Sequence, residues 1–423
     1  MATGRTESFD GHTLMSAVLE KYDSDHADQS FQIFVPKSAP GKTDSGELVL
    51  PSALALDKCG ICYAGNEKEI ATHCSHVTEL DLTGNSIRDW QEVFRIVEQM
   101  PQLKFLNLTS NNLQDSSYPV DYSGRFPKIT DLVLNSTFVS WDVIARVLKL
   151  FPNLVELHLS LNNYATVDLP SDCQQSSLIR LFLNENKFSE WSEIIKLGQA
   201  FQSLENMVMI NVNVESIIVD GPQCDVFSKL VALNISKTNL SSWEEIDKLD
   251  LFPSLQDVRL WDIPLLEEIP EKERRQFIIA RLPKLTRLNG SRVTEAERED
   301  AERAFIRYYI DHEEKPKRYS ELEAIHGKLD PLVKVNLEPQ TVFKIKVKFE
   351  DREEMMMVDS RNTVTEFKKA LQIFTGLPGN KFRLYYVETF HGQYRDLTEL
   401  RSSNRQLFSF NIREGDEFHI DRK

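Results

Sequence analysis

A short pattern of leucine-type residues returns along most of the chain, and this repetition constrains the fold more than any other feature. Its clearest copy is Val77-x-x-Leu80-x-Leu82-x-x-Asn85, in which x is any residue. Ten strong or weaker copies begin at Pro51, Val77, Leu103, Ile129, Leu154, Leu178, Leu204, Leu230, Leu255 and Leu285. Successive starts lie 24 to 30 residues apart. Such a period predicts a stack of similar units, because no single copy can bury its own apolar face.

The spacing within each copy predicts a short strand followed by a polar turn. Leu80 and Leu82 alternate with polar residues, so both point to one face of a strand. The amide of Asn85 can satisfy backbone groups at the turn, and its equivalents would form a ladder along the stack. This motif and period are the signature of leucine-rich repeats. We therefore expect an α/β fold in which residues 48–310 form a leucine-rich-repeat solenoid with a C-terminal cap.

A second period, twice the first, predicts helices on the outer side of the solenoid. Tryptophans 50 to 52 residues apart each open a helical pattern of apolar residues, at Trp90, Trp141, Trp191 and Trp243. The copies between them carry helix-breaking stretches such as Asp168-Leu169-Pro170. Full helices should therefore alternate with irregular connections, with the tryptophans packed beneath the helices as core residues.

The segments that flank the repeats have three different expected roles. Thr294 followed by Glu297 is a capping box, which predicts a charged helix closing the end of the solenoid. Residues 311–340 are expected to be a linker that holds one short helix. Residues 1–47 are mostly polar, so we expect a largely disordered segment or, around the amphipathic stretch Leu14–Tyr22, a loose cover over the first repeat.

Residues 341–423 differ in character from the repeats and resemble the ubiquitin-like β-grasp. Alternating residues at 342–349 and a partner at 355–358 predict a hairpin, followed by a helix at 364–371. Strands are then expected at 382–386 and 417–420. The resemblance places a candidate binding surface at Arg383, Tyr385 and His419, with Tyr385 where ubiquitin has the central isoleucine of its binding patch.

Composition excludes several classes of function. The net charge is −15, and since residues 341–423 carry 15 basic and 13 acidic residues, residues 1–340 carry −17. An acidic chain is a poor nucleic-acid binder, because binding requires cations that displace phosphate counterions. Five cysteines indicate a reducing compartment, and no apolar run has the length of a membrane span. We expect a cytoplasmic monomer that contacts neither nucleic acid nor membrane.

Metal and catalytic chemistry find little support in the sequence. Cys59 and Cys62 lie near His73, Cys74 and His76, but Cys59 occupies the repeat's own asparagine position and the second group lacks regular metal-site spacing. No nucleophile, base and acid can be assembled without arbitrary choices among 65 acidic residues. The sequence therefore predicts neither a metal, nor a cofactor, nor an enzyme.

The remaining candidate site is the concave face of the solenoid. Residues that flank the inner leucines of each strand point to solvent and should be polar. Several are instead aromatic or aliphatic, and such a patch rimmed by charge is typical of a protein-binding face. Chance exposure, or cover by the N-terminal segment, is the alternative. The predicted partner-binding residues are Phe105, Val133, His158, Phe182, Val208, Arg259 and Trp261.

The order of repeats, cap and tail domain resembles the tubulin-folding cofactor E family, and within it the cofactor E-like members, which lack a CAP-Gly domain. The cap stretch 288–300, with residues 66–71 and 305–309, supports the resemblance, which covers about 48–423. It implies a non-enzymatic chaperone that binds α-tubulin, dissociates the α/β-tubulin heterodimer and destabilises microtubules at the cytoskeleton. The tail domain would serve β-tubulin release or contact the proteasome. An adaptor or scaffold with a cargo other than tubulin is the alternative.

Overall fold

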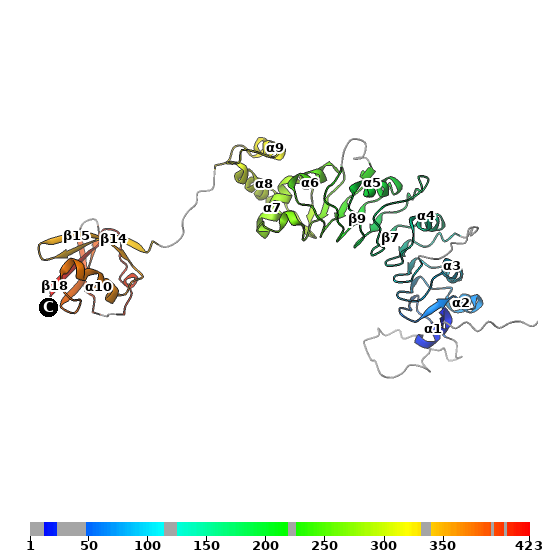
Figure 1. The fold of residues 1–423 in the computed structure, drawn as a ribbon, viewed down its shortest axis with the longest axis horizontal. Helices are drawn as coiled ribbons and strands as arrows, with labels where there is room; N and C mark the ends of the chain where they lie inside the picture. The colour runs from blue at the N-terminus through cyan, green and yellow to red at the C-terminus, as the bar shows by residue number, and fades with distance from the viewer. Residues whose placement is uncertain are drawn as a thin grey trace, which may run out of the picture. The chain divides into compact units, whose positions relative to one another are not determined.

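The chain is described by a computed structural model that covers residues 12–22, 48–113, 125–218, 226–330, 340–390, 393–401 and 404–423. It divides into two compact units, Met1–Pro331 and Leu332–Lys423, each with its own core. Figure 1 shows both units, which are described separately below.

The first unit is the expected leucine-rich-repeat solenoid. All ten copies form parallel strands, each beginning two residues after the start of its copy, and β13 (Ser291–Arg292) adds an antiparallel eleventh. The middle residue of each strand is at most 2% exposed, as the leucine alternation predicts. The parallel strands are β2 (Ala53–Ala55), β4 (Glu79–Asp81), β5 (Phe105–Asn107), β6 (Asp131–Val133), β7 (Glu156–His158), β8 (Arg180–Phe182), β9 (Asn206–Val208), β10 (Ala232–Asn234), β11 (Asp257–Arg259) and β12 (Arg287–Leu288).

Buried asparagines join consecutive repeats. Asn186 is 4% exposed, and its amide nitrogen donates to the carbonyl oxygens of Leu159 and Leu183 at 3.0 and 2.9 Å. Its amide oxygen accepts from the backbone nitrogens of Asn162 and Tyr164, both at 3.1 Å. One side chain therefore satisfies four backbone groups that belong to two repeats, which confirms the predicted ladder.

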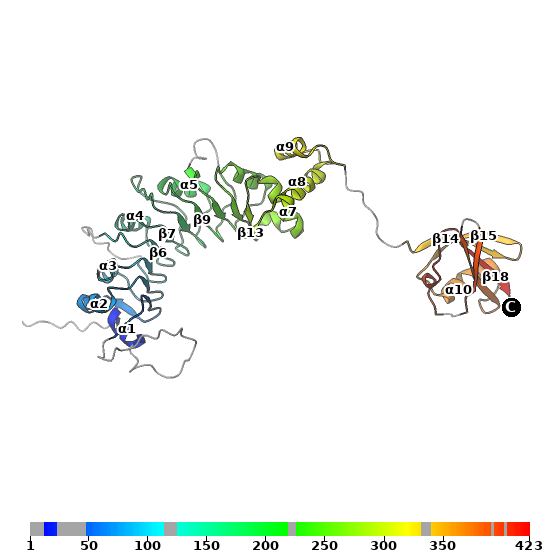
Figure 2. The ribbon, with the colours of Figure 1, turned by 180° about the vertical axis from the view of Figure 1, so that it is seen from behind.

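Helices cover the outer side of the solenoid, opposite the strands (Figures 1 and 2). The four tryptophans each open a helix, as predicted: α3 (Trp90–Glu98), α4 (Trp141–Leu150), α5 (Trp191–Ala200) and α6 (Trp243–Lys248), the last continued by η2 (Leu249–Leu251). Three tryptophans are buried and Trp243 is partly buried. A further helix, α2 (Glu67–Cys74), starts at the N-cap Asn66 and was not expected from the tryptophan period.

The N-terminal segment covers the first repeat over its described residues. β1 (His12–Thr13) pairs in parallel with β3 (Ile61–Tyr63), and α1 (Leu14–Tyr22) follows directly. Leu14 and Val18 are fully buried in the solenoid core. Of the two alternatives left open for Leu14–Tyr22, disorder or a cover, the structure shows a cover. The rest of the segment expected to be disordered lies outside the described residues.

Three helices close the other end of the solenoid. One of them, α9, lies in the region 311–340 that was expected to be a linker. After η3 (Pro264–Leu266), the helices are α7 (Glu271–Arg281), α8 (Glu295–Tyr309) and α9 (Lys317–His326). Thr294 caps α8 by accepting from the nitrogen of Glu297, as predicted. Because Tyr319 and Leu322 are buried against Phe305, α9 belongs to the cap rather than to a linker over 311–340.

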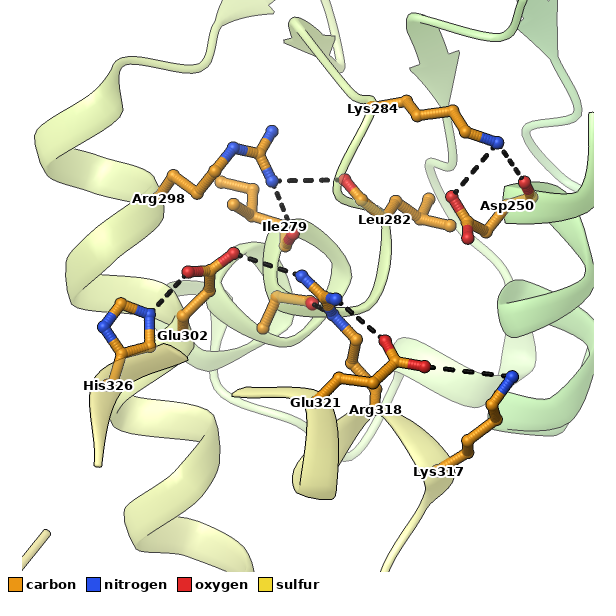
Figure 3. Close-up of polar contacts among 11 residues, drawn as sticks. Asp250, Ile279, Leu282, Lys284, Arg298, Glu302, Lys317, Arg318, Glu321 and His326 are labelled. Atoms are coloured by element: carbon orange, nitrogen blue, oxygen red, sulfur yellow. Dashed lines mark hydrogen bonds and ion pairs between the residues drawn. The ribbon is translucent and has the colours of Figure 1, made fainter. Parts of the chain in front are cut away.

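Ion pairs within the cap are largely shielded from water. Glu302, 7% exposed, lies 2.7 Å from the ring nitrogen of His326 and 3.3 Å from Arg318, so both ends of α9 are joined to α8 (Figure 3). Arg281 is 4% exposed, binds both carboxylate oxygens of Asp247 at 2.8 Å and lies 4.5 Å from the centre of the Trp243 ring. Removing one partner of such a pair would leave an uncompensated buried charge.

The second unit is a five-stranded β-grasp, as predicted. Its strands are ordered β15-β14-β18-β16-β17, with β14 and β18 parallel, and α10 covers one face through Phe367 and Leu371. The sequence missed one strand, β17, which is polar and lies at the edge. The elements are β14 (Val342–Phe349), β15 (Arg352–Asp359), α10 (Val364–Thr375), β16 (Phe382–Phe390), β17 (Gln393–Glu399), η4 (Leu407–Phe410) and β18 (Glu417–Arg422).

The ladder leads to a first prediction. Asn186→Ala should destabilise the solenoid by about 3 kcal/mol, because it leaves several buried backbone groups without partners. The measurement is the midpoint of urea unfolding followed by circular dichroism. Asn153→Ala is the matched control, since that exposed amide makes one bond, to the carbonyl of Pro127. Equal midpoints for both variants would contradict the role given to the ladder.

Candidate functional site

The inner face of the solenoid sheet is formed by the first and third residues of each strand. In the central strands β7 and β8 these residues are half-buried, whereas the middle residues Leu157 and Leu181 point into the core. Parallel pairing without register shifts places equivalent residues side by side, so His158 lies beside Val133 and Phe182. The face is consequently a continuous surface on which equivalent positions of neighbouring repeats lie side by side.

A cluster of charged and aromatic residues occupies the middle of this face. The rings of His158 and Phe182 stack with centres 4.0 Å apart and planes 6° from parallel. The Nε2 atom of His158 lies 2.6 Å from a carboxylate oxygen of Glu156. Arg180 donates to the other oxygen of Glu156 and approaches Asp131 at 3.9 Å. We call these five residues, Asp131, Glu156, His158, Arg180 and Phe182, the central cluster.

The Glu156 carboxylate holds the central cluster together. Burial raises the pKa of this carboxyl, but hydrogen bonds from His158 and Arg180 outweigh burial and hold the pKa below its ordinary value. The carboxylate therefore stays ionised and orients the imidazole of His158. The imidazole in turn packs against the ring of Phe182. A rigid aromatic surface framed by charge suits recognition of a protein better than proton transfer.

A hollow adjoins the central cluster on its C-terminal side. It measures about 220 Å³, and three predicted residues, Phe182, Val208 and Arg259, line it together with Asn206 and Asn234. Arg259 is exposed, and no side-chain partner for it is present among the described residues. The structure thus brings together four of the seven predicted residues, counting His158. It places the exposed Arg259 beside a mixed lining in which Phe182 and Val208 lie among asparagines and Asp257.

The other three predicted residues do not belong to this group. Val133 is only 7% exposed, so the expectation that it contributes to an exposed patch is wrong: its small side chain lies between larger ones on strands about 4.8 Å apart. Phe105 is half-buried on β5, beyond Asp131. Trp261 is 50% exposed and lines a separate hollow of about 1340 Å³ between the last repeats and the cap.

Sequence reasoning overlooked part of the site. Asp131 and Asn206 drew no attention because single polar residues on a solvent-facing strand are ordinary. Their position in the repeat could have identified them. Each is the first strand residue of its repeat, as Glu156 and Arg180 are, and the pairing of neighbouring strands brings these first residues together. The hollow beside Trp261 had no such signal, since residues of α7, among them Lys272, and the turn at Asn289 meet there only in the folded chain.

The predicted surface of the second unit is contiguous. Arg383 and Tyr385 alternate on β16, and the register places Tyr385 beside His419 and Arg383 beside Asp421. Arg383 is exposed, while Tyr385 and His419 are half-buried, and the His419 ring nitrogen lies 3.1 Å from Glu417. All three residues thus share the sheet face opposite α10. The surface is polar, and it carries charge at Arg383 and Asp421. It therefore differs from a binding patch centred on an isoleucine.

The described ranges contain neither a cluster of metal ligands nor a reactive thiol at Cys74. No group of three or more histidine, cysteine or acidic residues there could hold a metal ion. Cys74 is buried, and burial raises its thiol pKa to about 12, which makes the thiolate unavailable at neutral pH. None of the described helices has the length and apolarity to cross a membrane.

Comparison with known proteins identifies the family. A human protein named tubulin-specific chaperone cofactor E-like protein is 43% identical over 420 residues, covering 98% of each chain. The chain belongs to the cofactor E-like family. A Caenorhabditis elegans protein of the same name is 31% identical, covering 88% of this chain and 85% of its own. Human tubulin-specific chaperone E is 26% identical and covers 69% of this chain and 58% of its own. No protein-family model matches the chain.

The depressed pKa of Glu156 gives a second prediction for this cofactor E-like chain. A carboxylate whose folded-state pKa lies below the ordinary 4.5 stabilises the fold above that pH and loses the contribution as the pH falls through the lower value. Glu156→Gln should therefore lower the melting temperature at pH 7, and the difference from wild type should shrink below pH 4.5. Melting curves at several pH values test this. The exposed Glu205→Gln is the control, and a gap that does not depend on pH would contradict the assignment.

Proposed function

We propose that this protein is a non-enzymatic tubulin chaperone that binds α-tubulin on the inner face of its solenoid and promotes dissociation of the α/β-tubulin heterodimer. It would act in the cytoplasm and destabilise microtubules. The observation that supports the proposal is the 43% identity, over almost the whole of both chains, to a protein named tubulin-specific chaperone cofactor E-like protein. Because both units are included in that match, the shared activity is expected to use the same architecture.

The chemistry of the inner face supports protein binding. The stacked His158 and Phe182 rings form a half-buried aromatic pair on the inner face, and aromatic residues are enriched where binding energy concentrates in interfaces. Charge is distributed unevenly along the face. Its strand positions are acidic toward the N-terminal end, at Glu79, Asp81, Asp131 and Glu156. Toward the other end they are net basic, with Arg180, Arg259 and Arg287 against the single acid Asp257. Such a gradient would orient a partner that carries the opposite gradient.

Dissociation by this mechanism needs no nucleotide. A chaperone that binds free α-tubulin more tightly than α-tubulin within the dimer shifts the equilibrium by the difference between the two binding free energies. The inner face would meet this requirement if part of the α-tubulin surface that it covers is closed off in the dimer. The direction of the effect then follows from mass action, and the extent depends on chaperone concentration.

Two alternative roles for the β-grasp unit can be distinguished by experiment. In one, it contacts β-tubulin and assists its release; in the other, it contacts the proteasome. Deleting residues 341–423 separates them, because the deletion should abolish dissociation in the first case and spare it in the second. The solenoid has its own core and cap, so the shortened chain is expected to fold.

The direct test is native electrophoresis of purified tubulin dimer titrated with the full chain, without added nucleotide. The proposal predicts loss of the dimer band and a new complex that contains α-tubulin alone. A dimer that shifts intact would indicate an adaptor that binds tubulin without separating it. An unchanged dimer band would direct attention to an adaptor or scaffold with another cargo.

The site itself is tested by substitution. Phe182→Glu combined with Val208→Asp should weaken α-tubulin binding by roughly thirtyfold or more, because it replaces two apolar side chains of the inner face with charged ones. Fluorescence anisotropy of labelled tubulin is the readout. Leu251→Glu, at an exposed apolar position in η2 after α6, is the matched control and should bind normally. Normal binding by the double variant would exclude the inner face as the site.

A further inference from the structure

The β-grasp unit has an outer strand that is regular and open. β15 is the first strand in the sheet order and, among the residues that the structure describes, pairs with β14 alone, through eight consecutive residue pairs without a register shift. The opposite outer strand, β17, joins β16 with a register shift between Glu388 and Thr389. Proteins usually protect sheet edges with bulges, prolines or charged side chains, and β15 has charged side chains only near its two ends, which leaves Met355–Val358 without one. Its free backbone groups are therefore available to another strand.

Apolar side chains border this edge on both faces of the sheet. Met355 and Met357, 48% and 66% exposed, project on the face opposite α10, in accordance with strand alternation. On the other face, Ile373 of α10 is 94% exposed. An isoleucine this accessible costs solubility, and it lies on the one side of α10 that the domain core leaves uncovered.

A groove runs between β15 and α10. It measures about 730 Å³, with the half-buried Met356 and Phe374 as its apolar floor and the exposed Ala370 and Ile373 at its rim. The groove thus lies directly alongside the unpaired edge of β15. A strand added to β15 would place every second side chain in the groove and the remaining side chains against Met355 and Met357.

The charges at one end of the groove indicate what the added strand contains. Asp351 and Glu354 line it and have no ion-pair partner among the described residues. The C-terminal turn of α10, which includes Phe374, has no basic residue to offset the negative end of the helix dipole. Arg352 lies 5.4 Å from the ring centres of Phe349 and Phe374 and supports the floor. The local field at this end therefore favours a cation.

We propose that the edge of β15 and the adjacent groove bind an extended peptide segment of a partner protein by strand addition. The segment has β-branched apolar residues at alternate positions, pairs antiparallel to β15, and ends in lysine or arginine beside Asp351 and Glu354. Main-chain hydrogen bonds supply affinity in this mode of recognition, and the pockets for alternate side chains supply specificity. The site is separate from the proposed tubulin-binding face and does not depend on it.

The test uses the full chain and a fluorescein-labelled synthetic peptide, Ser-Val-Thr-Ile-Thr-Val-Lys-Arg, in fluorescence polarisation. Ile373→Glu should weaken binding by about tenfold or more, since it removes apolar contact and adds charge. The exposed Leu397→Glu on β17 is the matched control and should bind as wild type does. Glu354→Lys should lose about threefold in affinity for this peptide. It should gain a similar factor for a second peptide, Ser-Val-Thr-Ile-Thr-Val-Glu-Glu, in which the two basic residues are replaced by glutamates.

Two further measurements address strand addition itself. Peptide binding should slow hydrogen exchange of β15 amides, and N-methylation of alternate peptide nitrogens should abolish binding. Absence of peptide binding by the wild type, or equal binding by Ile373→Glu, would overturn the proposal. Sedimentation of the chain without peptide gives the remaining outcome: a dimer that Ile373→Glu dissociates would mean that a second copy occupies the edge, and would also overturn it.

Discussion

Stacking between repeats is the constraint on which the solenoid depends. A strand of three residues with one apolar turn cannot bury its own leucines, so each repeat is stable only between two neighbours. The buried asparagines make this stacking specific, because Asn186 bonds backbone groups of two repeats at once. Both ends of such a stack need closure. The chain supplies α1 at one end and α7 to α9 at the other, where buried charges such as Arg281 and Glu302 make the contacts selective.

The same stacking creates the candidate site. Parallel pairing in register repeats the positions beside the leucines every few ångströms, so residues about 25 positions apart in the chain become neighbours. This arrangement lets Glu156 bond both His158 and Arg180, and lets His158 stack on Phe182. None of these residues is unusual alone. Their common register converts separate polar and aromatic side chains into one preorganised surface of the kind that protein partners bind.

The two proposed sites differ in their mode of recognition. The solenoid presents a broad surface of side chains with a gradient of charge, which suits a folded partner. The β-grasp unit presents the open edge of β15 with a groove beside it, which suits an extended segment. A chain with both could hold a folded partner on one unit and a peptide on the other. This division fits the charge difference between the acidic first 340 residues and the nearly neutral remainder.

The sequence by itself determined the repeat register, since all ten strands begin two residues after the predicted starts, and it located the tryptophan helices and the β-grasp. Periodic burial of apolar residues is a local pattern, so sequence reveals it directly. Only the tertiary structure decided which surface residues act together. It buried Val133, separated Trp261 from the central cluster, moved α9 into the cap and opened the groove along β15. These outcomes depend on the sizes and charges of neighbours far apart in the chain, and no local pattern contains them.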